Sequence, residues 1–311
     1  MTGPLDAAGS VELAVAWRSG WPESRHLGAA VLVDADGAIV RALGDPDALV
    51  YPRSALKLVQ ATAVELLGVV FDEEQTVLSA ASHAGTPAHV SVVERMLADA
   101  GLDEGALRCP ADWPGDPAAR RAASEPRRIT MNCSGKHAGF LAACVAHGWD
   151  TESYLDPAHP LQRHVVETVE RTSGESIAHL GVDGCGAPVP VLSLAGLARS
   201  ASHTARAGTT LGDAILREPW AIDGPGRSNT VTIERSGLVA KLGAEGVLVL
   251  VTPGGEAVAV KSLDGAHRAT TVVGLELLVR EGLLAREIAD DTLAAIADPW
   301  TTLRLGSSLD G

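Results

Sequence analysis

A serine and a lysine near the first long helical run are spaced so that they can act together. Ser54 and Lys57 lie three positions apart, shortly after Pro52, in a run rich in Ala, Leu, Lys and Glu that ends at Gly68. Proline suits the entry to a helix and glycine its end, so we expect the two side chains on one helix face. A desolvated lysine can lose its proton and serve as the base for a serine nucleophile. The same spacing also fits a helix-capping serine beside a solvated lysine.

Two later elements follow this pair in an order that is typical of one kind of catalytic site. Ser82 is expected on a turn between two helices, and Lys241 is expected on a late strand. Serine β-lactamases and penicillin-binding proteins carry S-x-x-K, S-D-N and K-T-G in this order. Here Ser-His-Ala stands at 82–84 and Lys-Leu-Gly at 241–243, so the sequence departs from a β-lactamase proper.

The charge and the hydrophobic runs of the chain limit which partners and which cellular location we expect. A net charge of −14 over 311 residues argues against nucleic acid and anionic membranes as partners. No apolar run is long enough to span a bilayer, and residues 1–6 lack the basic and apolar regions of a signal peptide. We therefore expect a cytoplasmic protein whose four cysteines are reduced.

Strands are expected at both ends of the chain and helices between them. Alternating or β-branched runs followed by turns predict a sheet from about 12–43 and about 230–262, and helix formers dominate about 54–220. No repeat or linker interrupts the chain, so one domain is expected over 1–311. This pattern predicts an α/β (α+β) fold in which an antiparallel sheet is built from both termini and helices surround it.

The chain as a whole resembles the asparaginase II family, the group typified by rhizobial inducible asparaginases. The resemblance rests on stretches in the family's order, of which Asn-Cys-Ser-Gly-Lys-His is the most specific: 53–57, 81–83, 132–139, 183–185, 226–227 and 241–244. It implies a fold like that of serine β-lactamases, penicillin-binding proteins and serine glutaminases. It also implies a homodimer that hydrolyses L-asparagine to L-aspartate and ammonia.

The resemblance assigns catalytic roles to two serine–lysine pairs. Ser54 becomes the nucleophile and Lys57 its base. Ser82 and Lys241 become a second pair, which relays a proton to the leaving ammonia or activates the water that releases the acyl group. Two lysines this close cannot easily both be charged, so one should have a depressed pKa. Backbone N–H groups near Ser54 are expected to hold the oxyanion.

The resemblance also places a metal site on Cys133, Lys136 and Cys185. Two thiolates suit Zn²⁺, and a lysine ligates only as the neutral amine. The expected role of the zinc is structural or substrate-positioning. The alternative is a pair of buried, reduced cysteines beside a lysine.

Substrate-binding residues are expected around these groups. Arg227 can pair with an α-carboxylate through its planar fork, or it is an ordinary surface arginine. Asp183 can receive the substrate amine or orient the lysine. The remaining residues expected to bind substrate are Arg53, His83 and Gly184.

Other functions remain open at this point. A glutaminase or another small-amide amidohydrolase of the same fold would use the same catalytic groups, and the pocket would decide between them. Two alternatives are not enzymes: a non-catalytic amino-acid-binding protein and a metal-binding protein without catalysis. Substitution of Ser54 separates the enzymes from the binding proteins.

Overall fold

The structure, a computed structural model, describes residues 3–299 and 301–309. Its larger sheet is antiparallel and has the order β10-β1-β2-β9-β8-β7, with β3 paired to the side of β2. A smaller sheet has the order β4-β6-β5. The strands are β1 (Val11–Arg18), β2 (Trp21–Val33), β3 (Ile39–Leu43), β4 (Leu49–Val50), β5 (His179–Val182), β6 (Pro188–Ser193), β7 (Val239–Gly243), β8 (Val247–Val251), β9 (Ala257–Ser262) and β10 (Thr302–Leu305).

Helices fill the middle of the chain and return after the last long strand. The α-helices are α1 (Lys57–Leu66), α2 (Glu73–Ser79), α3 (Pro87–Asp99), α4 (Pro117–Ala122), α5 (Ser134–His147), α6 (Pro160–Ser173), α7 (Leu194–Ala205), α8 (Thr210–Arg217), α9 (Ser228–Ser236), α10 (Thr270–Arg280) and α11 (Arg286–Ile296). Short 3-10 helices are η1 (Arg53–Leu56), η2 (Glu104–Ala106), η3 (Pro219–Ile222) and η4 (Ser307–Leu309). No helix in the described part of the chain is long and apolar enough to cross a membrane.

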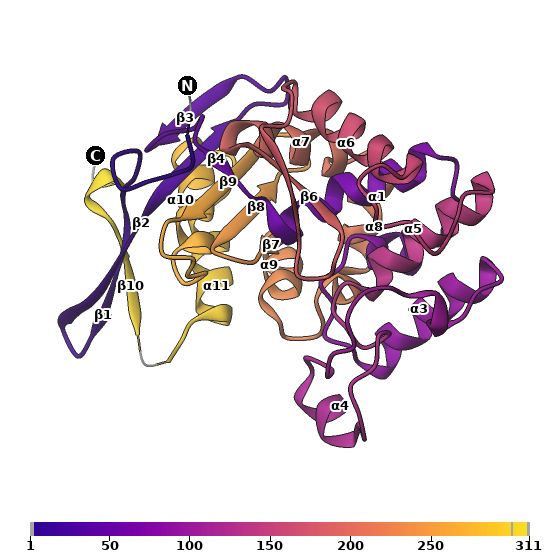
Figure 1. Ribbon diagram of the computed structural model, residues 1–311. Coiled ribbons are helices and arrows are strands. Elements are labelled where there is room, and N and C mark those ends of the chain that lie inside the picture. The colour runs from indigo at the N-terminus through magenta and orange to yellow at the C-terminus, as the bar shows by residue number, and fades with distance from the viewer. Residues whose placement is uncertain (1–2, 300, 310–311) are drawn as a thin grey trace.

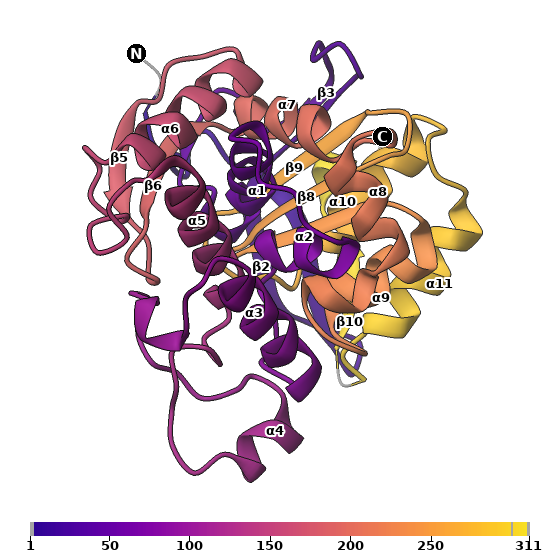
Figure 2. The ribbon, with the colours of Figure 1, turned by 90° about the vertical axis from the view of Figure 1, so that its right-hand side faces the viewer.

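The larger sheet is covered by helices on both faces. β8 is buried along its whole length, and its alternate side chains must point to opposite faces. Leu248 and Leu250 approach Gly274 of α10, while α7 packs against β2, β8 and β9. Figure 1 shows the strands from both chain ends side by side at the centre of the molecule, and Figure 2 shows the helices from the middle of the chain gathered on one side.

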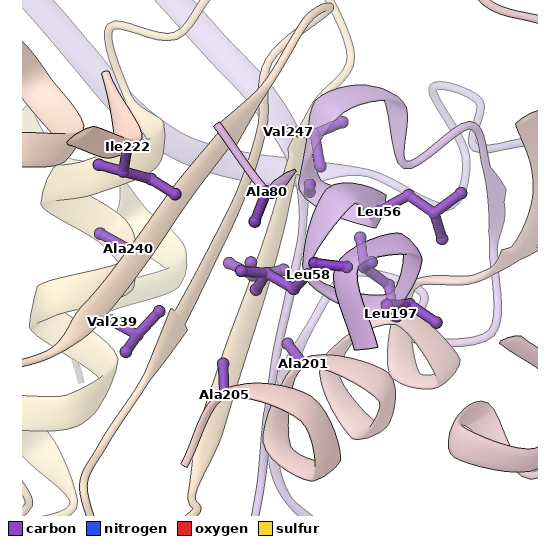
Figure 3. Packing of buried hydrophobic residues seen from close by; sticks show 14 of the residues in the cluster. Leu56, Leu58, Ala80, Leu197, Ala201, Ala205, Ile222, Val239, Ala240 and Val247 are labelled. Carbon is purple, nitrogen blue, oxygen red and sulfur yellow. The ribbon is translucent and has the colours of Figure 1, made fainter. Parts of the chain in front are cut away.

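The core rests on Ala, Val and Leu, as the low aromatic content requires. Figure 3 shows Leu58 of α1 and Ala205 of α7 between their helices and the strands of the sheet. α1 is buried on nearly every side, from Lys57 to Val64. This central position fixes the helix that follows Ser54, and with it the start of the candidate site.

The expected fold class is confirmed, but one expected boundary of the sheet is corrected and three strands are added. Residues 230–236, which were expected in the sheet, form most of α9. Their β-branched residues favour a strand, yet α9 packs against α11 and ends at Gly237, whose φ of 67° is a left-handed cap. The strands β5, β6 and β10 were not expected, because each is short. β6 and β10 also pair with the distant strands β4 and β1, and β5 pairs with β6 across the short turn at 183–187.

Candidate active site

The nucleophile candidate lies on a strained turn. Ser54 is the second residue of η1, and the residue before it, Arg53, has a φ of 50°. A left-handed backbone at a residue other than glycine costs about 1–3 kcal/mol and recurs at functional sites. Arg53 Nε donates a hydrogen bond of 2.7 Å to Asp183 Oδ1, and this ion pair is largely shielded from water. The pair therefore ties the turn that presents Ser54 to the loop before Cys185.

Ser54 opens into a cavity of about 480 Å³. This volume is within the range of small-molecule sites, about 300–1,000 Å³. The walls come from η1, the ends of α2 and β7, and the loop before α9. The cavity is lined by Ser54, Ser82, Asn132, Asp223, Gly226, Arg227, Ser228, Asn229, Leu242, Gly243, Ala244 and His267.

Two buried lysines converge on the hydroxyl of Ser82. Lys57 Nζ donates to Ser82 Oγ at 3.0 Å and to Ala81 O at 2.6 Å. Lys241 Nζ donates to Ser82 Oγ at 2.8 Å and to Leu242 O at 3.0 Å. Lys57 therefore lies against Ser82 in this structure and not against Ser54, the contact expected from their spacing in the sequence.

The pKa of Lys241 is depressed in this setting. Burial, and after it the positive charge of Lys57, lowers the pKa of Lys241 to about 7. A large part of the Lys241 population is therefore a neutral amine at neutral pH, as expected for one of two lysines that share a partner. A neutral amine hydrogen-bonded to a serine hydroxyl can accept or return a proton through it.

The end of β7 packs closely against the turn that carries Ser54. A Cβ at Gly243 would lie 2.5 Å from Pro52 O and 3.0 Å from Ala55 N, so only glycine allows this approach. Ser54 and Ala244 then line the same cavity from two sides. Their backbone N–H groups are the candidates for the expected oxyanion donors.

A polar cluster before α9 holds the arginine that was expected to bind a carboxylate. Arg227 Nε donates to Asp223 Oδ1 at 2.5 Å, and Asn229 Nδ2 donates to Asp223 Oδ2 at 3.1 Å. Asn229 Oδ1 in turn accepts from Leu242 N at 2.8 Å. Arg227 is thus held by Asp223 through Nε, and its side chain lines the cavity.

Five polar residues of the cavity wall were not proposed as site residues: Asn132, Asp223, Ser228, Asn229 and His267. The dense polar run at 223–229 was a usable signal for three of them, since a polar loop beside a site residue favours a binding role. His267 gives no such signal, because it reaches the cavity through the packing of β9 and α10.

Cys133, Lys136 and Cys185 converge beside the lysines. All three are buried, and Lys136 Nζ lies 3.0 Å from Cys185 Sγ. A hydrogen bond with Cys185, supported by the charges of Lys57 and Lys136, holds the pKa of Cys133 well below its ordinary value despite burial. The same hydrogen bond, together with burial, raises the pKa of Cys185. The interaction thus favours the thiolate form at Cys133 over that at Cys185.

The lysine of this cluster keeps its proton in the absence of a metal. Burial alone lowers the pKa of Lys136, but the sulfurs of Cys185 and Cys133 outweigh burial and raise it. Within residues 3–299 and 301–309, no three His, Cys, Asp or Glu side chains gather closely enough to hold a metal ion. An ion here would rely on two sulfurs and the Lys136 amine.

The other expected substrate-binding residues lie outside the cavity wall. Asp183 is paired with Arg53, and Gly184 N donates to Asp183 Oδ1 at 2.9 Å. His83 is buried, with Nε2 donating to Ser134 Oγ at 2.8 Å and Nδ1 accepting from Gly85 N at 3.1 Å. Both nitrogens of His83 are thus occupied by the protein, which indicates a supporting residue for the turn after Ser82.

The chain is similar to one protein family and to several solved structures. A family model described as L-asparaginase II matches residues 14–307. Similar solved structures include a β-lactamase from Mycobacterium bovis, at 16% identity, with 86% of this chain and 94% of that chain covered and a TM-score of 0.40. Another is Mglu in its native form, at 14% identity, with 82% and 64% covered and a TM-score of 0.48. The search of curated proteins found no match.

Proposed function

Since the chain belongs to the L-asparaginase II family, we propose that it hydrolyses L-asparagine to L-aspartate and ammonia through an acyl-enzyme on Ser54. Family membership makes it an amidohydrolase of the asparaginase kind. The observation that carries the rest of the proposal is the shared contact of Lys57 and Lys241 with Ser82 Oγ, at the wall of the cavity that Ser54 lines.

Acylation would use this lysine–serine network as an acid and base. Ser54 Oγ attacks the carboxamide carbon and loses its proton to the network, in which the neutral Lys241 amine is the available acceptor. The network then returns the proton to the nitrogen, the C–N bond breaks, and ammonia leaves. Lys57, which was expected to be the direct base of Ser54, can reach it only by moving away from Ser82 or through the Ser82 hydroxyl.

Deacylation would run through the same groups in reverse. Water gives one proton to the network as its oxygen attacks the acyl carbon, and Ser54 Oγ takes a proton as the ester bond breaks. The backbone N–H groups of Ser54 and Ala244 would hold the carbonyl oxygen as it gains charge in both steps. L-Aspartate is the product.

The cavity also supports recognition of an amino acid. Arg227, held at Nε by Asp223, would pair with the α-carboxylate through its outer nitrogens. The buried carboxylate of Asp223 and the oxygen of Asn132 are acceptors on the same wall for an α-ammonium. The side chain of the substrate would then extend toward Ser54.

We further propose that Cys133, Lys136 and Cys185 hold Zn²⁺. The residues fit the ion in donor chemistry, because two convergent sulfurs, one of them deprotonated, suit zinc. Binding would have to displace the proton of Lys136. A bound ion would supply a fixed positive charge next to the lysine network and brace the loop of Asp183.

The oligomeric state and the cellular location are also part of the proposal. The family resemblance implies a homodimer, and light scattering on the purified chain measures this oligomeric state. A cytoplasmic location remains a prediction from the sequence.

A panel of amides tests the proposed substrate. Ammonia release would be measured from L-asparagine, L-glutamine and D-asparagine at equal concentrations. One added methylene is worth only about 1–3 kcal/mol in a pocket, so slow L-glutamine turnover is compatible with an asparaginase. Preferential release from L-asparagine is the expected result. Preference for L-glutamine would make the chain a glutaminase, and no release from any amide would favour an amino-acid-binding protein.

A further inference from the structure

A second cavity of about 560 Å³ adjoins the catalytic cavity. Ser228, Leu242 and His267 line both, so the two cavities share this part of their walls. The rest of the second cavity comes from α10, α11, β10 and the segments beside them, and apolar side chains alternate there with polar and charged ones such as Arg268 and Asp298. These apolar residues include Val272, Leu293, Ala294, Ile296 and Leu303.

The boundary between the two cavities includes Leu242, the residue next to Lys241. Leu242 directly follows Lys241, and its carbonyl oxygen accepts a hydrogen bond of 3.0 Å from Lys241 Nζ. Lys241 also holds Ser82 Oγ, the group that would pass a proton to the leaving nitrogen. A substituent on that nitrogen would therefore extend past Leu242 and His267 into the second cavity.

Ammonia does not need this space. A primary carboxamide releases ammonia, which is small enough to fit inside the catalytic cavity. Apolar surface is instead favourable for an apolar ligand group, at roughly 25 cal/mol per Å² of area removed from water. The volume is also within the usual range for small-molecule sites.

We propose that the second cavity binds an apolar group on the leaving amine, so that the enzyme also hydrolyses secondary β-amides of L-aspartate. The inference rests on the proposed function, because it uses the same Ser54 acyl-enzyme. Ser54 Oγ forms the ester bond, the C–N bond breaks, and the amine leaves with a proton from the lysine network. Water then releases L-aspartate as in the reaction of L-asparagine.

The test compares two amides and two matched variants. The substrates are L-asparagine and the β-benzylamide of L-aspartate, with aspartate release measured for both and benzylamine release for the second. Ala294→Trp fills the second cavity from an exposed position on α11. Ala295→Trp is the control, because Ala295 is exposed on the same helix and is not part of the cavity wall.

The expected result is turnover of both amides by the wild-type chain. Ala294→Trp should lower kcat/KM for the benzylamide by about tenfold or more and leave that for L-asparagine within about twofold, because the added bulk blocks only the amine substituent. Ala295→Trp should change neither.

Two results would overturn the inference and leave the proposed function intact. One is turnover of L-asparagine with none of the benzylamide. The other is benzylamide turnover that Ala294→Trp leaves unchanged in a folded protein. Failure to turn over either amide would instead overturn the proposed function and the inference together. Turnover of the benzylamide alone would support the second cavity and contradict L-asparagine as the substrate.

Discussion

Lys241 Nζ lies 2.8 Å from Ser82 Oγ, although the two residues are 159 positions apart in the chain. Lys57 approaches the same oxygen at 3.0 Å. A single serine hydroxyl thus joins two buried amines, one of which has a pKa of about 7. In the proposed mechanism, this junction supplies the group that accepts and returns the proton near neutral pH.

The pKa of Lys241 predicts how the activity depends on pH. The pKa is depressed, so the amine is charged below about pH 7 and neutral above it. Because the neutral form accepts the proton of Ser54, kcat/KM should rise with pH through about 7. A profile of kcat/KM measured from about pH 5 to about pH 9 checks this. In Lys241→Met the rise of kcat/KM through about pH 7 should disappear. A wild-type profile that falls as pH rises through this window would contradict the role of Lys241.

The ion pair between Arg53 and Asp183 predicts a combined effect on stability and rate. Asp183→Asn weakens the pair that holds the strained turn before Ser54. We expect a loss of about 1–3 kcal/mol in the free energy of unfolding, because the pair is mostly shielded, and a lower kcat. Urea denaturation and steady-state kinetics measure the two effects.

Glu74→Gln is the control for that variant. It weakens an exposed pair with Arg95, and such pairs contribute only about 0–1 kcal/mol. Equal, small effects of the two substitutions would contradict a structural role for Asp183. A raised KM with unchanged stability would instead assign Asp183 to the substrate amine.

Much of the site was predictable from the sequence because its residue types and their order are unusual. Ser54, Ser82, Arg227 and Lys241 line or adjoin one cavity, and Cys133, Lys136 and Cys185 meet as expected. Short local motifs identify these residues in the sequence. The two ends of the chain then join one sheet, which brings the motifs close together.

The remaining features depend on contacts that no local pattern records. Lys57 turns to Ser82 because the end of α2 places the Ala81 carbonyl and the Ser82 hydroxyl within reach of its amine. His83 is likewise held by its surroundings, because its two ring nitrogens form hydrogen bonds with Ser134 and Gly85. α9 forms where β-branched residues favour a strand, since its packing against α11 outweighs local propensity.

Arg227 provides a prediction about substrate affinity. Arg227→Lys keeps the charge but removes the planar fork, so KM for L-asparagine should rise by about tenfold or more with a smaller change in kcat. Arg235→Lys is the matched control on α9, where Arg235 is exposed and paired with Asp291. An unchanged KM in Arg227→Lys would contradict the proposed contact between Arg227 and the α-carboxylate of the substrate.

The proposed zinc site predicts a difference between two cysteines of the same region. Cys133→Ser should lower the zinc content of the purified protein from about one ion per chain to near zero, since it removes a thiolate ligand. Cys144→Ser should not, because burial raises the pKa of Cys144 to about 12 and the residue only packs in α5. Elemental analysis after gel filtration measures both, and equal zinc in the two variants would contradict the site.

The most direct test of the account is the turnover of L-asparagine by Ser54→Ala. Because Ser54 is half-buried at the cavity wall, its replacement by alanine removes only one oxygen from the edge of a cavity. The variant should therefore fold as the wild type does, which circular dichroism and thermal unfolding verify. The account predicts a loss of about 10³-fold or more in kcat, with binding of L-aspartate retained. Turnover within about tenfold of the wild-type rate would show that Ser54 is not the nucleophile.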